Sequence, residues 1–173
     1  MFYKNQTLGI VIDGPTTLSA SKEVELVIDW KELHDEFAQR GQLLRTTYIT
    51  PIFCGEDDHV QIRPMVDWME YNGFKVITRH AREEDGDHGR RIKGGNIQVE
   101  FAIEAMRLAQ HCNHIVLFTG DGSYAPLVSE LQQMGCRVSV CCCVSVTSDT
   151  LRRKADNFIH IEKLRMTIGK VLA

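Results

Sequence analysis

Short runs of strand-forming residues alternate along the chain with stretches in which apolar side chains recur every three or four positions. The short runs are rich in Val, Ile, Thr and Tyr, which predicts β-strands. We expect these strands at residues 7–12, 43–53, 74–78, 114–119, 137–144 and 158–161, the last of them at an edge of the sheet.

Apolar periodicity and capping residues predict helices between these strands. Asp29 is a suitable N-cap for a helix that begins near Trp30 and ends before Gly41. Further helices are expected at residues 60–72, 96–110 and 124–134, with a short one from 148 and a last one from 162. The apolar side of the helix at 96–110 is expected to consist of Val99, Ala102, Ile103, Met106 and Ala109.

Strands that are separated by helices indicate right-handed crossovers and a parallel sheet covered on both faces. The expected fold class is therefore α/β, a three-layer domain with a central, mostly parallel sheet flanked by helices. No repeat, linker or low-complexity tract divides residues 1–173, so we expect a single domain.

The bulk composition narrows the function classes. The net charge of −3 offers no general attraction to nucleic acid, so any such contact needs a local basic patch. No apolar run approaches the roughly 20 residues of a membrane helix, and the first residues lack a signal-peptide pattern. We therefore expect a cytoplasmic protein without membrane contact. The six cysteines lack paired spacings, which favours reduced core thiols over disulfides or a zinc site.

Two predicted strands end in an aspartate followed by glycine, at Asp13-Gly14 and at Asp121-Gly122. In a parallel sheet, ligands bind outside the carboxyl ends of the strands. Two carboxylates that meet there repel each other unless a cation neutralises them, and Mg²⁺ or Mn²⁺ prefers oxygen ligands. Such a metal could support phosphodiester hydrolysis. The alternative is that each aspartate only caps a turn or helix.

The segment at 79–95 is crowded with charge and glycine, and it predicts a mobile loop at the same edge of the sheet. Its second half is purely basic and carries Arg90, Arg91 and Lys93. These side chains are candidates for contact with a phosphate backbone, with Lys93 next to a helix N-terminus as the best of them. The alternative is a solvated loop of mixed charge.

Taken together, these motifs resemble the LabA-like branch of the NYN domains, which belong to the PIN-like nuclease superfamily. The resemblance covers residues 8–168 and implies a PIN-like α/β fold, an acidic cluster that holds a divalent metal, and cleavage of RNA. The matching stretches are GIVIDG at 9–14, IRPMVDW at 62–68, YNG at 71–73, IKG at 92–94, VEFAIEAM at 99–106, the run 116–128 around TGDG at 119–122, and LRRKADNF at 151–158.

The chain departs from the family pattern at three polar positions. The family pattern Asp-Gly-x-Asn has Thr16 as its last residue here, and the acid in the first turn of the family helix is Gln98. Where the family pattern is Gly-Asp-Gly-Asp-Phe, this chain has Ser123 and Tyr124 as the last two residues. An uncharged amide attracts a cation far less than a carboxylate does. Thr16, Gln98 and Ser123 are therefore expected to contact nucleic acid rather than hold metal.

Two glutamates remain as candidate catalytic residues beside Asp13 and Asp121. Glu104 matches a family acid, but it lies roughly 9 Å along the helix axis and about 120° around it from Gln98. It therefore cannot simply replace the missing carboxylate. Glu100 could swing toward the site, and the alternative for it is a surface position.

Two functional hypotheses follow. The first is a metal-dependent ribonuclease that cleaves single-stranded RNA. The second is a catalytically degenerate NYN domain that serves as a regulatory or RNA- or protein-binding module, with a homodimer as one form. We expect the last helix to pack on its own domain, with a dimer seam as the alternative. An aspartyl phosphatase is disfavoured because Pro15 stands where the second acid is needed.

Overall fold

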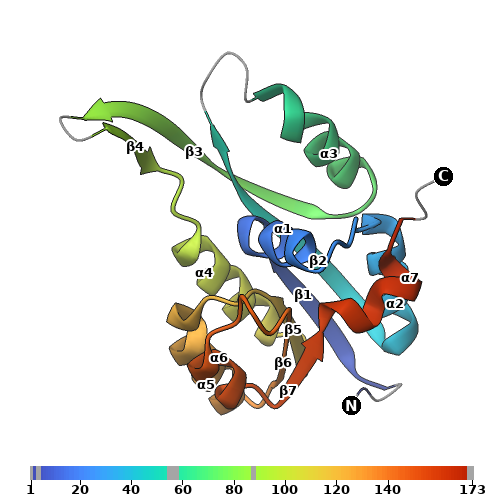
Figure 1. Ribbon diagram of the computed structural model, residues 1–173. Helices are drawn as coiled ribbons and strands as arrows, with labels where there is room; N and C mark the ends of the chain where they lie inside the picture. The colour runs from blue at the N-terminus through green and yellow to red at the C-terminus, as the bar shows by residue number, and fades with distance from the viewer. Residues whose placement is uncertain (1, 3–4, 54–58, 87–88, 171–173) are drawn as a thin grey trace.

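A seven-stranded sheet forms the centre of the molecule, with the strand order β4-β3-β2-β1-β5-β6-β7 (Figure 1). The computed structural model describes residues 2, 5–53, 59–86 and 89–170. All neighbouring strands are parallel except β3 and β4, which confirms the predicted α/β class with a mostly parallel sheet. The strands are β1 Thr7–Asp13, β2 Gln42–Phe53, β3 Lys75–Gly86, β4 Gly89–Gly94, β5 His114–Phe118, β6 Arg137–Cys142 and β7 Asn157–His160.

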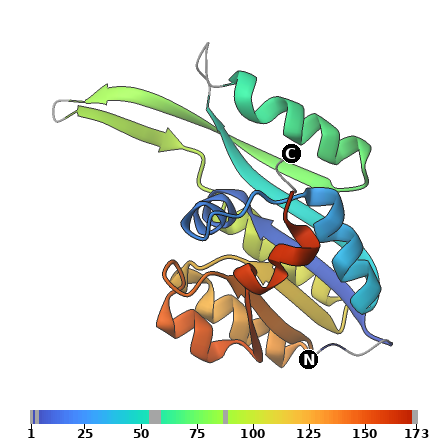
Figure 2. The same ribbon diagram turned by 45° about the vertical axis from the view of Figure 1, so that its right-hand side comes forward.

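Helices cover both faces of the sheet (Figure 2). Side chains alternate along β1, so Ile10 and Ile12 join the core on one face while Val11 joins the core on the other. Helices α1, α2, α3 and α7 contribute to the first core, and α4, α5 and α6 to the second. The helices are α1 Gly14–Glu23, α2 Trp30–Arg40, α3 His59–Tyr71, α4 Gln98–Ala109, α5 Ala125–Gln133, α6 Asp149–Lys154 and α7 Arg165–Ile168, with 3₁₀ turns η1 Gly122–Tyr124 and η2 Ile161–Leu164.

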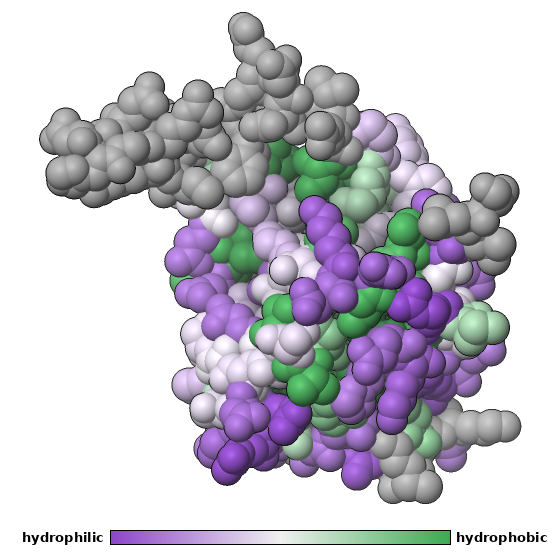
Figure 3. Space-filling view, viewed as in Figure 1, coloured by the Kyte–Doolittle hydropathy of each residue, from purple (hydrophilic) through white to green (hydrophobic). Residues whose placement is uncertain are grey.

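The surface agrees with this layering. On the face shown in Figure 3, hydrophilic residues predominate over the lower half, and hydrophobic residues form small areas among them. Five cysteines are buried free thiols, as expected, and Cys54 lies outside the described residues. Within the described part of the chain, no helix combines the length and apolar character that crossing a membrane requires.

Helix α1 was not predicted, and its sequence explains why. It begins at Gly14 directly after β1, and its N-cap is Asp13, whose side chain accepts a hydrogen bond from the backbone N–H of Thr16. Pro15 in the first turn suits this start, since a helix has no partner for that N–H. The helix buries mainly small residues such as Ala20, so it shows little apolar periodicity.

The prediction of a loop at 79–95 was wrong. Strand β3 continues to Gly86, and β4 pairs with it in antiparallel register as a hairpin that extends beyond the rest of the sheet (Figures 1 and 2). The register places Glu84 opposite Arg91 and Asp85 opposite Arg90. This backbone pairing gives the main-chain N–H and C=O groups of a polar segment their hydrogen-bond partners.

The predicted apolar side of α4 was also largely wrong. The helix packs on the sheet through Phe101, Ala105 and Leu108, which are buried, whereas Val99, Ile103 and Met106 are exposed to solvent. Residues 101, 105 and 108 and residues 99, 103 and 106 each satisfy helical spacing, so the helix has two apolar faces. Periodicity cannot decide which of the two faces the sheet.

His114 at the start of β5 is fully buried, with its ring nitrogens 3.0 Å from Gln6 Oε1 and 2.8 Å from Ser139 Oγ. Burial, aided by the charge of Arg137, lowers the pKa of His114 to about 4. The folded protein therefore keeps a neutral imidazole at pH values where an unfolded histidine, with a pKa near 6.5, takes up a proton. Stability is present above pH 6.5 and is lost as the pH falls toward 4.

We predict that wild-type protein loses about 1 kcal/mol of unfolding free energy between pH 7.5 and pH 5.5 because of His114. In His114→Gln the loss should shrink to a small remainder, since no histidine is left to titrate at that position. Urea denaturation at the two pH values measures this difference. The matched control is His111→Gln at an exposed position. A wild-type decrease that survives in His114→Gln would contradict the prediction.

Candidate functional site

Asp13 and Asp121 lie at the carboxyl ends of two neighbouring strands. Strands β1 and β5 pair in parallel with Ile12 opposite Phe118, so the residues that follow emerge at one edge of the sheet. Asp13 is only 5% exposed, and its Oδ1 lies 3.0 Å from the Thr16 backbone nitrogen. Asp121 is half-buried, and its Oδ1 accepts a hydrogen bond from the Ser123 backbone N–H at 2.9 Å.

A buried hydroxyl links the two aspartates. Thr119 Oγ1 donates to Asp13 Oδ2 at 3.4 Å, and the backbone N–H of Asp121 donates to Thr119 Oγ1 at 3.2 Å. The structure therefore brings together the two carboxylates that the sequence analysis singled out. Each also caps a helix or 3₁₀ turn, so the capping alternative of the sequence prediction is present in the structure.

The two carboxyl groups have different electrostatic surroundings. Burial raises the pKa of Asp13, and the nearby charge of Asp121 adds to this, although hydrogen bonds from Thr16 and Thr119 oppose it. Burial also acts to raise the pKa of Asp121, but hydrogen bonds from Ser123 and Gln98 outweigh it and leave that pKa lowered. Among the described residues, none with a positive charge contributes to the pKa of Asp13, and a cation would stabilise its charged form.

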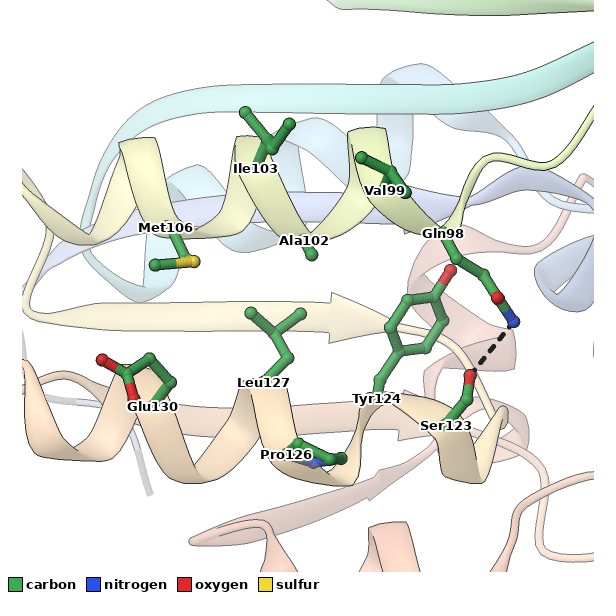
Figure 4. Close-up of a pocket in the computed structure, with 10 residues that line it drawn as sticks. All are labelled: Gln98, Val99, Ala102, Ile103, Met106, Ser123, Tyr124, Pro126, Leu127 and Glu130. Atoms are coloured by element: carbon green, nitrogen blue, oxygen red, sulfur yellow. Dashed lines mark hydrogen bonds between the residues drawn. The ribbon is translucent and has the colours of Figure 1, made fainter.

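Gln98, the first residue of α4, closes the site from the side of that helix. Its Nε2 donates to Asp121 Oδ2 at 2.9 Å and lies 3.1 Å from Ser123 Oγ, the contact drawn in Figure 4. Asp121 caps η1, and α5 begins at Ala125, close to the predicted helix at 124–134. Gln98 and Ser123 thus both serve as neighbours of Asp121.

Glu100 and Glu104 are not brought to the two aspartates. Glu100 forms an ion pair with Arg79, and the hydrogen bond from that guanidinium lowers the pKa of Glu100. Glu104 is 3% exposed, and its carboxylate oxygens lie 2.6 and 2.8 Å from Lys75 Nζ. Both glutamates are therefore directed at basic residues of β3. Among the described residues, no group of three or more His, Cys, Asp or Glu side chains is placed to hold a metal ion.

The glycines that follow the two aspartates are required by close packing. A Cβ on Gly14 would lie 2.7 Å from the hydroxyl oxygen of Tyr48, and a Cβ on Gly122 would lie 2.6 Å from Ser148 Oγ. A larger residue at either position would push the adjoining strand end away from its neighbours. In each Asp-Gly pair, the glycine thus lets the backbone pack closely against a neighbouring residue and so positions the aspartate before it.

Tyr124 lies within the electrostatic reach of the two aspartates, and the sequence predicts no role for it. It is 3% exposed and its ring stacks near Phe101, with 4.3 Å between ring centroids. Its hydroxyl has no hydrogen-bond partner among the described residues. Burial and the charges of Asp13 and Asp121 raise the pKa of Tyr124, so the phenol remains a proton donor. The sequence feature that could have indicated a role for Tyr124 is the tyrosine itself, because the family pattern has phenylalanine at this position.

The basic residues of the hairpin can be placed only by their backbone. Arg90, Arg91 and Lys93 lie in β4, with Lys93 opposite Arg82, and their side chains are outside what the structure describes. Thr16 is half-buried beside Asp13, and its backbone N–H is already engaged by that carboxylate.

Known proteins resemble this chain over almost its whole length. It is 24% identical over 173 residues to "Low amplitude and bright protein LabA" of Synechococcus elongatus, covering 98% of this chain and 91% of that protein. A crystal structure of a protein of unknown function from Vibrio parahaemolyticus has a TM-score of 0.72, covers 92% of this chain and 94% of its own, and is 20% identical. That structural likeness supports the fold alone.

The NYN domain family matches residues 7–162, a region that includes both aspartates, Gln98 and Tyr124. The match spans six of the seven helices and all strands of the sheet. The chain therefore belongs to the NYN domain family, a PIN-like nuclease family.

Proposed function

We propose that this protein binds single-stranded RNA at the edge of the sheet formed by Asp13 and Asp121, and that it cleaves the RNA slowly with a divalent cation. The observation that carries the proposal is the pair of hydrogen bonds through Thr119, which joins the Asp13 carboxylate to the backbone N–H of Asp121 at the ends of adjacent parallel strands. NYN and PIN-like nucleases generally use divalent metals, and the family membership makes nucleic acid the expected ligand.

The side chains at this edge fit Mg²⁺ or Mn²⁺, although weakly. Mg²⁺ is commonly bound by one or two carboxylates together with waters and substrate phosphates. Asp13 and Asp121 supply two carboxylates, and the described residues that hydrogen-bond to Asp13 carry no positive charge. The bound cation would polarise the phosphate and activate water. With only two charged ligands, we expect tight binding only when RNA contributes a phosphate oxygen.

The remaining side chains would orient the RNA. Thr119 keeps Asp13 and Asp121 at a constant separation, because it donates to one and accepts from the backbone of the other. The hydroxyl of Tyr124 is buried near the charges of both aspartates and has no hydrogen-bond partner among the described residues, so it could donate to a ligand only if the site opened. Basic residues of the hairpin, Arg90, Arg91 and Lys93, would neutralise phosphates further along the strand.

A second candidate is an RNA- or protein-binding module that no longer cleaves. The observation that favours it is the contact of Gln98 Nε2 with Asp121 Oδ2 at 2.9 Å. An amide donor there takes over part of the neutralising role that a cation would have. Cleavage assays separate this candidate from the first.

We predict slow, Mn²⁺-dependent cleavage of single-stranded RNA by the wild-type protein, and a loss of about 100-fold or more in Asp13→Asn, because one of two charged ligands is removed. Asparagine caps a helix as well as aspartate does, so α1 should persist, which circular dichroism checks. The control is Asp35→Asn, which removes the same charge from α2, where the Asp35 carboxylate forms an ion pair with Lys31. Wild-type activity no higher than that of Asp13→Asn would exclude the ribonuclease and leave the second candidate.

We also predict that Gln98→Glu binds Mn²⁺ at least about tenfold more tightly than wild type, because a third charge would face the cation. Isothermal titration calorimetry measures this affinity, and the cleavage rate should rise with it. Gln110→Glu is the matched control, since it adds the same charge at the exposed C-cap of α4, at the opposite end of the helix from Gln98. Equal Mn²⁺ affinity in both variants would show that position 98 does not face the cation.

A further inference from the structure

A groove of about 550 Å³ runs between α4 and α5 and begins at the candidate site. Its walls include Val99 and Met106, which are 63% and 38% exposed, and Leu127 on the opposite helix. In Figure 4 the side chains of Ala102, Met106 and Leu127 lie in the space between the two helices. The volume falls within the range of roughly 300–1,000 Å³ that is typical of small-ligand pockets.

Polar groups stand at the two ends of this groove. Gln98 and Ser123 form one end, and both hydrogen-bond to the Asp121 carboxylate. The carboxylate of the exposed Glu130 lies at the other end. The groove is therefore continuous with the site at Asp13 and Asp121. From residue 98 to residue 106 the helix spans roughly 12 Å, which is enough for a nucleotide base but not for a long peptide segment.

We propose that this groove binds a nucleobase of the RNA strand whose phosphate lies at Asp13 and Asp121, and that it prefers bases with an amino group. The inference rests on the proposed function and adds a base-binding subsite to it. A flat base buries apolar ring surface against Val99, Met106 and Leu127.

The charge of the groove selects a base over a phosphate. Glu130 is an acceptor only, and it repels a phosphate while it accepts a hydrogen bond from the amino group of cytosine. Uracil presents a carbonyl oxygen at the corresponding position, which faces the same carboxylate unfavourably. At the inner end, the side chains of Gln98 and Ser123 supply further hydrogen-bonding groups.

The test is a double-mutant cycle between protein and RNA. Val99→Thr/Met106→Gln keeps the shape of both side chains but makes them polar, and Met166→Gln on α7, at a 92% exposed methionine, is the matched control. We expect the double variant to bind a five-residue cytidine oligomer about fivefold or more weakly than wild type and the control. In a second set of oligomers, one base is removed at a time. Wild-type protein should lose the same affinity for the oligomer that lacks the base bound in the groove. The double variant should lose no further affinity for that oligomer.

Three results would overturn the inference. Unchanged RNA affinity of Val99→Thr/Met106→Gln, with cleavage still lost in Asp13→Asn, would refute the groove and keep the proposed function. Wild-type protein that binds no RNA would refute the proposed function itself. A wild-type dimer in sedimentation velocity that the double variant dissociates would show that a second copy of the chain covers the groove.

A second measurement does not depend on the metal site. Cytidine without phosphate should shift the methyl NMR signals of Met106 and Ile103 in wild-type protein, whereas uridine should shift them less. Glu130→Gln should reduce the difference between the two nucleosides severalfold, because the neutral amide carries no charge to repel the uracil carbonyl. Equal shifts for cytidine and uridine in wild type would contradict the role of Glu130.

Discussion

The parallel pairing of β1 with β5 is the constraint on which the site depends. Their register ends both strands at one edge and leaves Asp13 and Asp121 on either side of the Thr119 hydroxyl. The arrangement opposes stability, since Asp13 is buried beside a second carboxylate. The helix cap at Thr16 and the hydrogen bond from Thr119 offset part of this cost. In the part of the chain that the structure describes, this buried carboxylate has no cationic partner, which is typical of a side chain that serves a ligand.

The surroundings of the two aspartates differ from a fully acidic metal cluster. Glu100 and Glu104 have their charges matched by Arg79 and Lys75 within the protein, and Gln98 contributes an amide where the family pattern has an acid. The two glutamates are therefore neutralised away from the aspartates, and the Gln98 amide is the group that contacts Asp121. The same first turn of α4 that carries Gln98 opens the groove toward Met106, which couples the edge of the sheet to an apolar surface.

Much of the fold could be predicted from local patterns. Strands β1, β2, β5, β6 and β7 appear close to their expected positions because β-branched residues cluster in short runs. Helix α1 was not predicted because it buries small residues, which give little apolar periodicity, and because its start depends on the N-cap at Asp13. The hairpin of β3 and β4 was not predicted because a charged segment with several glycines is typical of a loop, and only the backbone pairing shows that it forms two strands.

The sequence by itself determined the alternation of strands and helices, the two Asp-Gly strand ends and the three polar departures at Thr16, Gln98 and Ser123, because each is a local property of neighbouring residues. Only the tertiary structure decided which polar groups meet. Lys75 and Glu104 are distant in sequence, and their pairing removes that glutamate from the site. Likewise, α4 has two apolar stripes, and packing on the sheet selected Phe101 and Ala105, which left Val99 and Met106 to form the groove. Long-range contacts of this kind follow from the packing of layers, which local periodicity does not encode.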